Sequence, residues 1–275
     1  MVELISVIVA TYNREDALEA ALRSFARQTE NQFEVVVADD GSRPATAAVI
    51  AAWTSRLGVP LKHVWHEDRG FRLAEIRNRA IRACAGAYCI FLDGDCITQP
   101  DFVAVHRGLA EPGYFVTGNR VLMSRALSER ILATGFESDS WGLGHLLAHW
   151  WRGDVNRIAP LAGLPLGLLR KLGGRRLQGA RGCNMACFRA DLERIDGFDA
   201  AFTGWGREDS DLFARLIRSG VRRKDGRFAT GVLHLWHPDS ERSRLPDNQA
   251  KLELTLRSDR VRAVRGLSAL DGMST

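Results

Sequence analysis

The sequence predicts an α/β protein built on a mostly parallel central sheet with helices on both faces. Short apolar runs rich in β-branched residues alternate with helical segments through residues 1–120. Strands joined in this way run parallel, because each helix returns the chain to the end where the preceding strand began. Polar and acidic residues follow three of the strands, at the edge where such sheets bind ligands.

Each element rests on a local pattern. Apolar runs predict strands at 4–10, 33–39, 61–65 and 88–92. Apolar residues at helical spacing, such as Leu18, Leu22 and Phe25, predict helices at 15–28, 44–57 and 73–84. The second half is less regular: it holds a Trp- and Gly-rich stretch at 135–179, a helix that opens at 204–209 and runs to 219, a strand at 229–235 and a C-terminal helix from 246.

The composition is that of an ordinary soluble globular protein. Of 275 residues, 45% are apolar and 26% are charged. The net charge of +5 is too small to indicate nucleic-acid binding, and we expect none. The positive excess lies in one segment, because 141–180 holds six basic residues and one acid.

Cysteine usage and the N-terminus predict a cytoplasmic protein. The five cysteines are odd in number, contain no CxxC pair and fall mostly in apolar runs, as expected of buried thiols in a reducing compartment. The N-terminal strand lacks the basic region and cleavage site of a signal peptide. No apolar run reaches the roughly 18 to 20 residues of a spanning helix. Attachment to the inner face of the plasma membrane stays open.

Carboxylates follow two of the predicted strands. Asp93 and Asp95 end the fourth strand and, by strand alternation, should point the same way, as oxygen ligands for Mg²⁺ or Mn²⁺ on a diphosphate. Asp39 and Asp40 end the second strand, where a carboxylate can bind a uracil imide or a ribose hydroxyl and Tyr12 can stack on the base. Turn formation is the alternative for both pairs, because Asp-Gly and Asp-Asp-Gly-Ser are also turn sequences.

Together these motifs resemble family 2 glycosyltransferases of the Rossmann-like GT-A fold. The matching segments are 6–13, 39–42, the helix that carries Arg77 and runs to Gly86, and 91–95. The resemblance implies nucleotide-sugar binding, with Asp95 as a direct metal ligand and Mn²⁺ or Mg²⁺ as cofactor. It implies donor-nucleotide contacts by Ala10, Thr11, Tyr12, Asp40, Arg77 and Asp93. For Arg77 the alternative is an ordinary surface ion.

The second half is similar to the galactosyltransferase-type C-terminal region of β-1,4-galactosyltransferases and chondroitin polymerases. The similarity lies in 182–185, 196–199 and above all Gly-Trp-Gly-Arg-Glu-Asp-Ser-Asp at 204–211. It implies that Asp209 is the catalytic base and Glu208 an acceptor ligand. A plain helix start is the alternative, because acids are favourable at helix N-termini. Trp205, with Gly206 beside it, is expected against a sugar ring rather than in the core.

Histidines follow the last predicted strand. The resemblance implies that one of them binds the metal opposite Asp95; spacing favours His237, and His234 stays a second candidate. The earlier pair His63 and His66 is interpreted as structural. Trp141, Trp150 and Trp151 occur with leucines and basic residues in the insert at 141–176, a composition typical of an interfacial segment on anionic lipid. An acceptor-site lid is the alternative.

We therefore expect a metal-dependent, inverting glycosyltransferase. It would move a hexose-type sugar from a UDP-sugar to a glycan or lipid-linked acceptor in cell-surface polysaccharide or lipopolysaccharide synthesis. The alternatives are a retaining transferase and a non-catalytic carbohydrate-binding or assembly subunit. The expected regions are a nucleotide-sugar-binding α/β half at 1–122, the aromatic and basic insert at 123–181, a galactosyltransferase-like acceptor and catalytic region at 182–245 and a C-terminal helix at 246–275.

Overall fold

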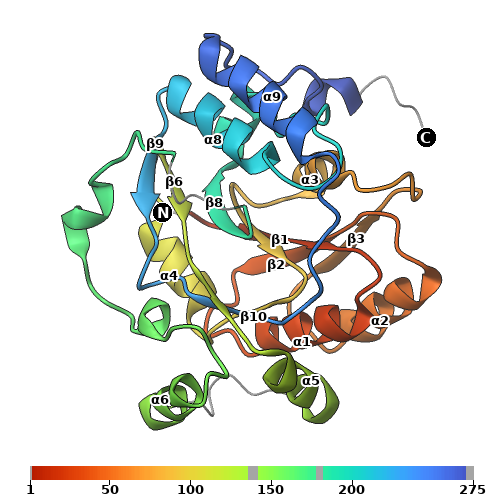
Figure 1. Ribbon diagram of the computed structural model, residues 1–275, viewed down its shortest axis with the longest axis vertical. Coiled ribbons are helices and arrows are strands. Elements are labelled where there is room, and N and C mark those ends of the chain that lie inside the picture. The colour runs from red at the N-terminus through yellow and green to blue at the C-terminus, as the bar shows by residue number, and fades with distance from the viewer. Residues whose placement is uncertain (1, 136–141, 178–181, 271–275) are drawn as a thin grey trace.

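The computed structural model describes residues 2–135, 142–177 and 182–270. Its centre is a seven-stranded sheet in the order β3-β2-β1-β4-β8-β6-β9 (Figure 1). The strands are β1 (Ile5–Thr11), β2 (Phe33–Asp39), β3 (Leu61–Trp65), β4 (Tyr88–Asp93), β6 (Tyr114–Thr117), β8 (Asn184–Phe188) and β9 (Arg222–Asp225). β1 to β4 are parallel, whereas β8 runs antiparallel to both β4 and β6. The predicted mostly parallel sheet is confirmed.

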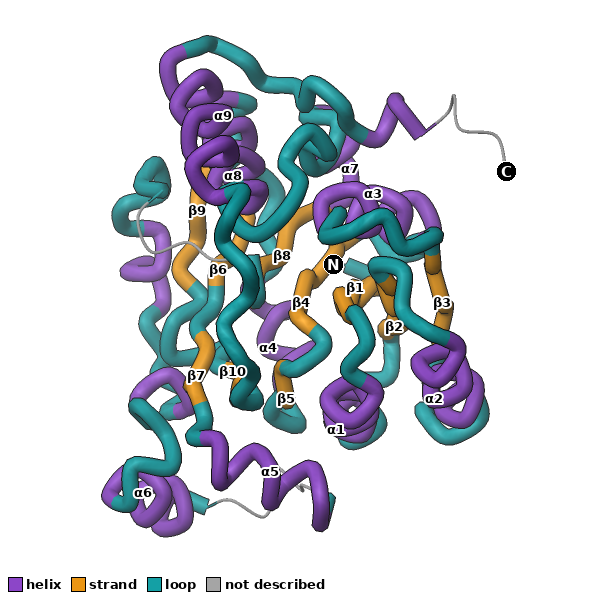
Figure 2. Tube along the Cα trace, turned by 45° about the vertical axis from the view of Figure 1, so that its right-hand side comes forward, coloured by secondary structure: helices purple, strands orange, loops and turns teal. Residues whose placement is uncertain are grey.

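Helices cover both faces of this sheet, as predicted (Figure 2). One face carries α1 (Glu15–Phe25), α2 (Pro44–Thr54) and α4 (Phe102–Leu109); the other carries α3 (Leu73–Ala83), α7 (Arg189–Arg194) and α8 (Glu208–Arg218), with α9 (Leu245–Arg257) against α8. Alternation along the strands produces the two cores: Val7 and Val9 pack with α1, whereas Ile8 packs with α3. A strand buried on both faces reads as a continuous apolar run, which is why the sequence revealed it.

A second, three-stranded sheet lies beside the first. It consists of β5 (Cys96–Ile97), β10 (Val232–His234) and β7 (Arg120–Leu122), with β10 in the middle. β10 pairs antiparallel with β5, so that His234 lies opposite Cys96. The helices α5 (Arg125–Thr134) and α6 (Leu143–Trp151) and the short 3₁₀ helices η2 (Ala159–Leu161), η3 (Gly167–Lys171) and η4 (Leu267–Leu270) complete the described chain. The small sheet thus joins the histidine strand to the residues after β4.

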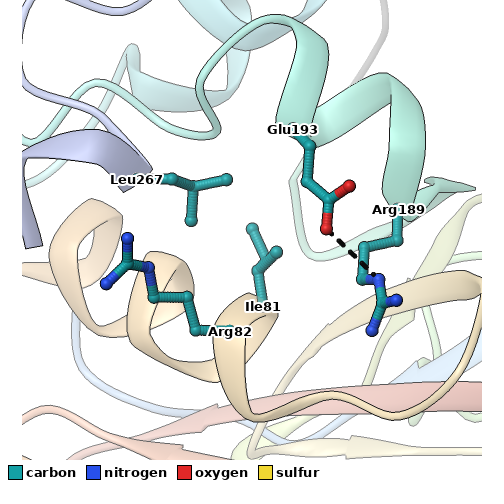
Figure 3. A pocket seen from close by; sticks show the side chains of 5 residues that line it. All are labelled: Ile81, Arg82, Arg189, Glu193 and Leu267. Carbon is teal, nitrogen blue, oxygen red and sulfur yellow. Dashed lines mark ion pairs between the residues drawn. The ribbon is translucent and has the colours of Figure 1, made fainter. Parts of the chain in front are cut away.

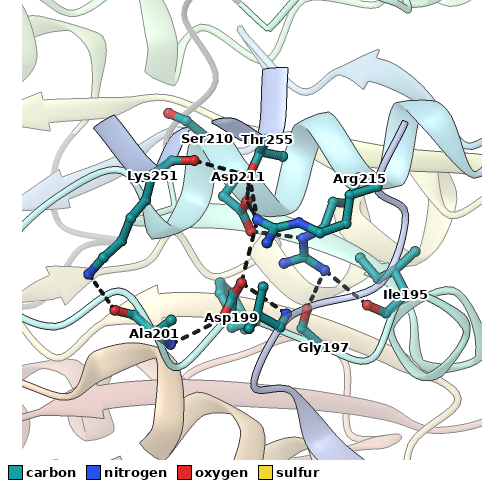
Figure 4. A network of polar contacts seen from close by, with 12 residues as sticks. Ile195, Gly197, Asp199, Ala201, Ser210, Asp211, Arg215, Lys251 and Thr255 are labelled. Atoms are coloured by element: carbon teal, nitrogen blue, oxygen red, sulfur yellow. Dashed lines mark hydrogen bonds and ion pairs between the residues drawn. The ribbon is translucent and has the colours of Figure 1, made fainter. Parts of the chain in front are cut away.

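A buried ion pair anchors α8. Arg215 Nε lies 2.8 Å from Asp211 Oδ2, and both side chains are fully buried. The guanidinium also donates hydrogen bonds to the carbonyl oxygens of Ile195, at 2.9 Å, and Gly197, at 2.8 Å. Thr255 of α9 donates to Asp211 Oδ1 at 2.6 Å (Figure 4). One buried cluster therefore fixes α8 to α9 and to the loop before it.

Removing Arg215 should strongly destabilise the protein. Arg215→Met leaves the fully buried Asp211 with only the partly exposed Arg260, 3.2 Å from Oδ1, as a cation. Breaking a buried ion pair in this way costs about 3 to 5 kcal/mol of unfolding free energy. Chemical denaturation measures the loss. The matched control is Arg257→Gln, because Arg257 is exposed and forms a surface pair with Glu253, worth at most about 1 kcal/mol. Equal losses in the two variants would contradict the anchoring role.

Candidate active site

The carboxyl ends of β1 and β2 form an edge that Tyr12 and Asp40 share. Tyr12 is 47% exposed, and its hydroxyl donates to Asp68 Oδ2 at 2.9 Å. Asp40 is buried: Oδ1 lies 2.6 Å from His66 Nε2, and Oδ2 accepts from the Arg72 backbone N–H at 2.8 Å. Each of these oxygens retains a lone pair for a ligand. The exposed tyrosine ring leaves room for a stacked base.

Asp39 and His63 make a second pair next to this edge. His63 Nε2 lies 2.9 Å from Asp39 Oδ2, and the Ser42 N–H donates to Asp39 Oδ1 at 2.8 Å. Burial acts to raise the pKa of Asp39, but the hydrogen bonds from His63 and Ser42 prevail and lower it. Asp39 thus closes the turn after β2. Each histidine of the early pair therefore has its own aspartate partner in this turn: His63 contacts Asp39, and His66 contacts Asp40.

The two aspartates after β4 have different partners. β4 ends at Asp93, and the Gly94 N–H donates to the Ala10 carbonyl at 2.7 Å. A Cβ on Gly94 would lie 2.9 Å from that same oxygen, so the turn requires glycine. Strand alternation therefore does not extend to Asp95. Asp93 contacts Arg77, whereas Asp95 lies with the histidines. The two carboxylates still interact, because burial and the nearby charge of Asp93 act to raise the pKa of Asp95.

Thr11 occupies the same edge through its backbone. Its carbonyl accepts from the Asp40 N–H at 3.0 Å, and its Oγ1 is a buried atom without a hydrogen-bond partner among the described residues. Ala10 pairs with Asp93 across β1 and β4. The predicted nucleoside contacts at 10–12 and Asp93 are therefore neighbours in space.

Arg77 is not a surface ion. Its side chain is 1% exposed, and Nη2 donates to Asp93 Oδ1 at 3.0 Å. Nη1 lies 3.6 Å from Glu208 Oε1, and the guanidinium lies 5.4 Å from the ring centre of Phe198. The alternative considered from sequence is wrong because α3 turns this residue into the space between β4 and α8. Arg77 thus links the predicted donor side to the predicted acceptor side.

Asp95, His234 and His237 converge. Nε2 of His234 lies 3.3 Å from Asp95 Oδ1, and Nε2 of His237 lies 3.5 Å from Asp95 Oδ2. One ligand atom from each residue lies within 4.8 Å of the other two, as a metal ion requires. Burial lowers the pKa of His234 against the opposing charge of Asp95, which favours the neutral, ligating imidazole. Both candidate histidines therefore belong to one group.

The first turn of α8 presents Glu208 and Asp209. Glu208 is buried; burial and the Asp209 charge raise its pKa to about 7, although Arg77 opposes the shift. Its Oε2 is buried with no hydrogen-bond partner in the described structure. Asp209 Oδ2 accepts from the Gly182 N–H at 2.9 Å, and Oδ1 accepts from the Ser210 N–H at 2.6 Å. Glu208 and Asp209 therefore both begin α8 and line the candidate site.

Trp205 lies at the surface rather than in the core. Its side chain is partly exposed, and the Arg242 guanidinium lies 5.0 Å from the ring centre. Gly206 follows with φ of +100°, a conformation that favours glycine. The Gly206 carbonyl accepts from Asn248 of α9 at 3.0 Å, which fixes the loop before α8.

The sequence did not single out Arg120. This residue begins β7, and its Nη1 lies 3.4 Å from His234 Nε2. Burial acts to lower the pKa of Arg120, but the neighbouring thiols and the charges of Asp93 and Asp95 raise it. No local pattern indicates this contact, because it follows from the parallel pairing of β7 with β10.

A separate open pocket lies between α3, α7 and η4 (Figure 3). Its lining residues are Ile81, Arg82, Arg189, Glu193 and Leu267. Arg189 and Glu193 pair with one another across 3.4 Å. None of the predicted site residues lines this pocket, so the candidate site is the strand edge described above.

Comparison with known proteins identifies related chains. A family model described as glycosyl transferase family 2 matches residues 6–162, and a model described as N-terminal domain of galactosyltransferase matches 174–238. Validoxylamine A glucosyltransferase of Streptomyces hygroscopicus subsp. limoneus is 32% identical over 84% of this chain and 51% of its own length. Chondroitin synthase of Escherichia coli is 26% identical over 80% of this chain and 33% of its own. The chain spans about half or less of these relatives.

Solved structures show the same fold. Staphylococcus aureus TarS 1–349 in complex with UDP superimposes with a TM-score of 0.61 at 15% identity, covering 97% of this chain and 68% of that one. The mannosyltransferase PcManGT from Pyrobaculum calidifontis, in complex with GDP-Man and Mn²⁺, gives 0.58 at 17% identity, covering 100% and 76%. The architecture is GT-A. Because the family 2 model covers more than half of the chain, this protein belongs to glycosyl transferase family 2.

Proposed function

We propose that this protein is a glycosyltransferase that is metal-dependent and inverting and uses a UDP-sugar. The observation that carries the proposal is the convergence of two groups near the end of β4: Asp95 with its histidines, and the carboxylates of α8, of which Arg77 links Glu208 to Asp93. TarS structures in complex with UDP and UDP-GlcNAc support a uridine nucleotide. We also propose that the transferred sugar is of the hexose type. The acceptor would be a glycan or lipid-linked molecule in cell-surface polysaccharide or lipopolysaccharide synthesis.

Each group has a role in this reaction. Tyr12 stacks on the base, Asp40 with Ala10 and Thr11 binds the nucleoside, and Asp93 and Arg77 lie toward the diphosphate. Trp205 and Gly206 form the acceptor platform, and Glu208 binds an acceptor hydroxyl through its free Oε2. Asp209 takes the proton of the attacking hydroxyl. Its hydrogen bonds from Gly182 and Ser210 hold the carboxylate in a fixed orientation.

The donor set at Asp95 fits a divalent transition ion. One carboxylate and two imidazoles would hold Mn²⁺ in preference to Mg²⁺, which prefers oxygen ligands. When bound, the ion supplies a positive charge that stabilises the departing UDP in place of a general acid. His234 is already held in its neutral form by burial, so it needs no proton release to ligate.

Both histidines should contribute to Mn²⁺ affinity. Replacing either His234 or His237 with alanine removes one of the converging ligands, and we expect Mn²⁺ affinity to fall by about tenfold or more, as measured by calorimetric titration. His145→Ala is the matched control, because His145 lies exposed on α6. If one histidine variant retains wild-type affinity, that residue is not a ligand.

Asp209→Asn should abolish transfer and leave UDP affinity nearly intact. The amide cannot accept the hydroxyl proton, and loss of a general base lowers the rate by about 10² to 10⁴. A radiolabelled-sugar assay measures transfer, and titration measures UDP affinity.

In the wild type, transfer should fall as the pH drops through about 7, because Glu208 then takes up a proton and loses its charge. Glu208→Gln should remove this step in the pH profile.

Three results would change these assignments. If Glu208→Gln abolishes transfer while Asp209→Asn keeps it, the base is Glu208, whose pKa of about 7 suits that role. If NMR shows that the product keeps the anomeric configuration of the donor, the enzyme is a retaining transferase. UDP binding without transfer to any acceptor would favour the non-catalytic carbohydrate-binding subunit.

We also propose that the insert contacts an anionic lipid surface. Trp151 of α6 is 87% exposed, and Leu168 and Leu172 in and after η3 are 79% and 74% exposed. The exposed basic residues Arg152, Arg157, Arg175 and Arg176 accompany them. The described part of the insert follows one edge of the molecule (Figure 1). Trp151 does not pack on the body as a lid would require, whereas Trp150 is half-buried. Trp141 lies outside the described residues.

Among the described residues no helix has both the length and the apolar character needed to span a bilayer. Contact would therefore be interfacial, through apolar side chains and arginines. In co-sedimentation, we expect the protein to bind vesicles that contain phosphatidylglycerol, less so at high salt, and the double variant Leu168→Ser, Leu172→Ser to lose most of this binding. Leu254→Ser is the control, an exposed leucine on α9. A wild-type protein that stays in the supernatant contradicts the proposal.

A further inference from the structure

Arg120 is a cation at the candidate metal site for which the proposed reaction has no role. It begins β7 and lies beside β10, where it pairs with Val232, two residues before His234. Its Nη1 lies 3.4 Å from His234 Nε2. Its Nε is buried and has no hydrogen-bond partner, and its partly buried guanidinium forms no ion pair with a carboxylate within the described parts of the chain, although the charges of Asp93 and Asp95 act on it. A guanidinium with an unused donor in such a site can bind an anion.

The contact between Arg120 and His234 is in conflict with its surroundings. An arginine only donates, so His234 Nε2 must offer a lone pair to accept from it. The same nitrogen lies 3.3 Å from Asp95 Oδ1, which only accepts when ionised and would require a proton on Nε2. One imidazole nitrogen cannot satisfy both neighbours. A divalent ion at Asp95 would resolve the conflict for His234 and Asp95, but it would repel the guanidinium.

We propose that Arg120 is a diphosphate-binding residue. With an ion at Asp95, His234 would offer its lone pair to the metal, and the Arg120 side chain would be free to bind phosphate oxygens of the nucleoside diphosphate. There it neutralises charge that one divalent ion leaves uncompensated, because the departing UDP carries more than two negative charges. This inference rests on the proposed function, since it requires a nucleoside diphosphate at the DxD edge. Without nucleotide, Arg120 and the metal would compete for the Nε2 lone pair of His234. With nucleotide, both would bind the diphosphate.

The variant Arg120→Gln tests this role by titration with three probes. UDP affinity in the presence of Mn²⁺ should fall by about ten- to hundredfold, the effect of losing a charged hydrogen bond. Uridine affinity should not change, because uridine has no phosphate. Mn²⁺ affinity in the absence of nucleotide should rise, since no cation then competes for His234. Arg120→Lys, which keeps the charge, should retain part of the UDP affinity. Arg257→Gln, an exposed arginine on α9, is the control for loss of one positive charge.

Opposite signs for UDP and Mn²⁺ separate this role from a merely structural one. If Arg120→Gln lowers Mn²⁺ affinity or weakens uridine as much as UDP, Arg120 only supports the shape of the site and the inference is wrong. Unchanged UDP affinity also overturns it, while the wild type's UDP binding leaves the proposed function standing. If the wild type binds neither UDP nor uridine, the nucleotide-sugar proposal fails first, and the role of Arg120 fails with it.

Discussion

The site depends on one buried cation, the guanidinium of Arg77. It lies between Asp93 at the end of β4 and Glu208 at the start of α8, two carboxylates whose charges would otherwise repel across a poorly solvated space. The two acids come from segments far apart in the chain. A single guanidinium with five donors in a fixed plane can contact both sides, which a lysine ammonium would not do with the same geometry. The end of β4 and the start of α8 are thereby linked through one side chain.

A second buried pair keeps that arrangement from drifting. Asp211 and Arg215 lie about one and two turns beyond Glu208 on α8, and Asp211 is tied to α9 through Thr255. Because a helix is stiff, fixing its second turn also fixes its first. Arg215 therefore sets where α8 lies, and Arg77 sets how Glu208, the first carboxylate of α8, faces Asp93 at the end of β4. Burying either arginine costs desolvation free energy that an apolar side chain of similar size would not incur, which is consistent with a role in orientation.

The elements of the first half were predictable because their signals are local. β2 and β3 occupy the predicted residues, and α3 ends one residue before the predicted end. In the second half, the strand expected at 229–235 is present as the shorter β10. β7, β8 and β9 escaped prediction because they are three to five residues long and take their partners from remote segments. The sequence motifs and their spacing indicated Asp95 and the two histidines as candidate metal ligands. Arg120 could not be found in this way, because only the pairing of β7 with β10 places it beside His234.

The position of β8 has a consequence for how the chain folds. This antiparallel strand comes from the second matched segment, yet it lies between β4 and β6 of the first. Ending the chain before β8 would expose the edges of both neighbours, and exposed strand edges promote association between copies. The sheet can close only after residues beyond the insert have been synthesised, so one edge of β4 and the facing edge of β6 stay open until β8 follows. Closure through contacts so distant in the sequence is slow, and the open edges are prone to association during that time.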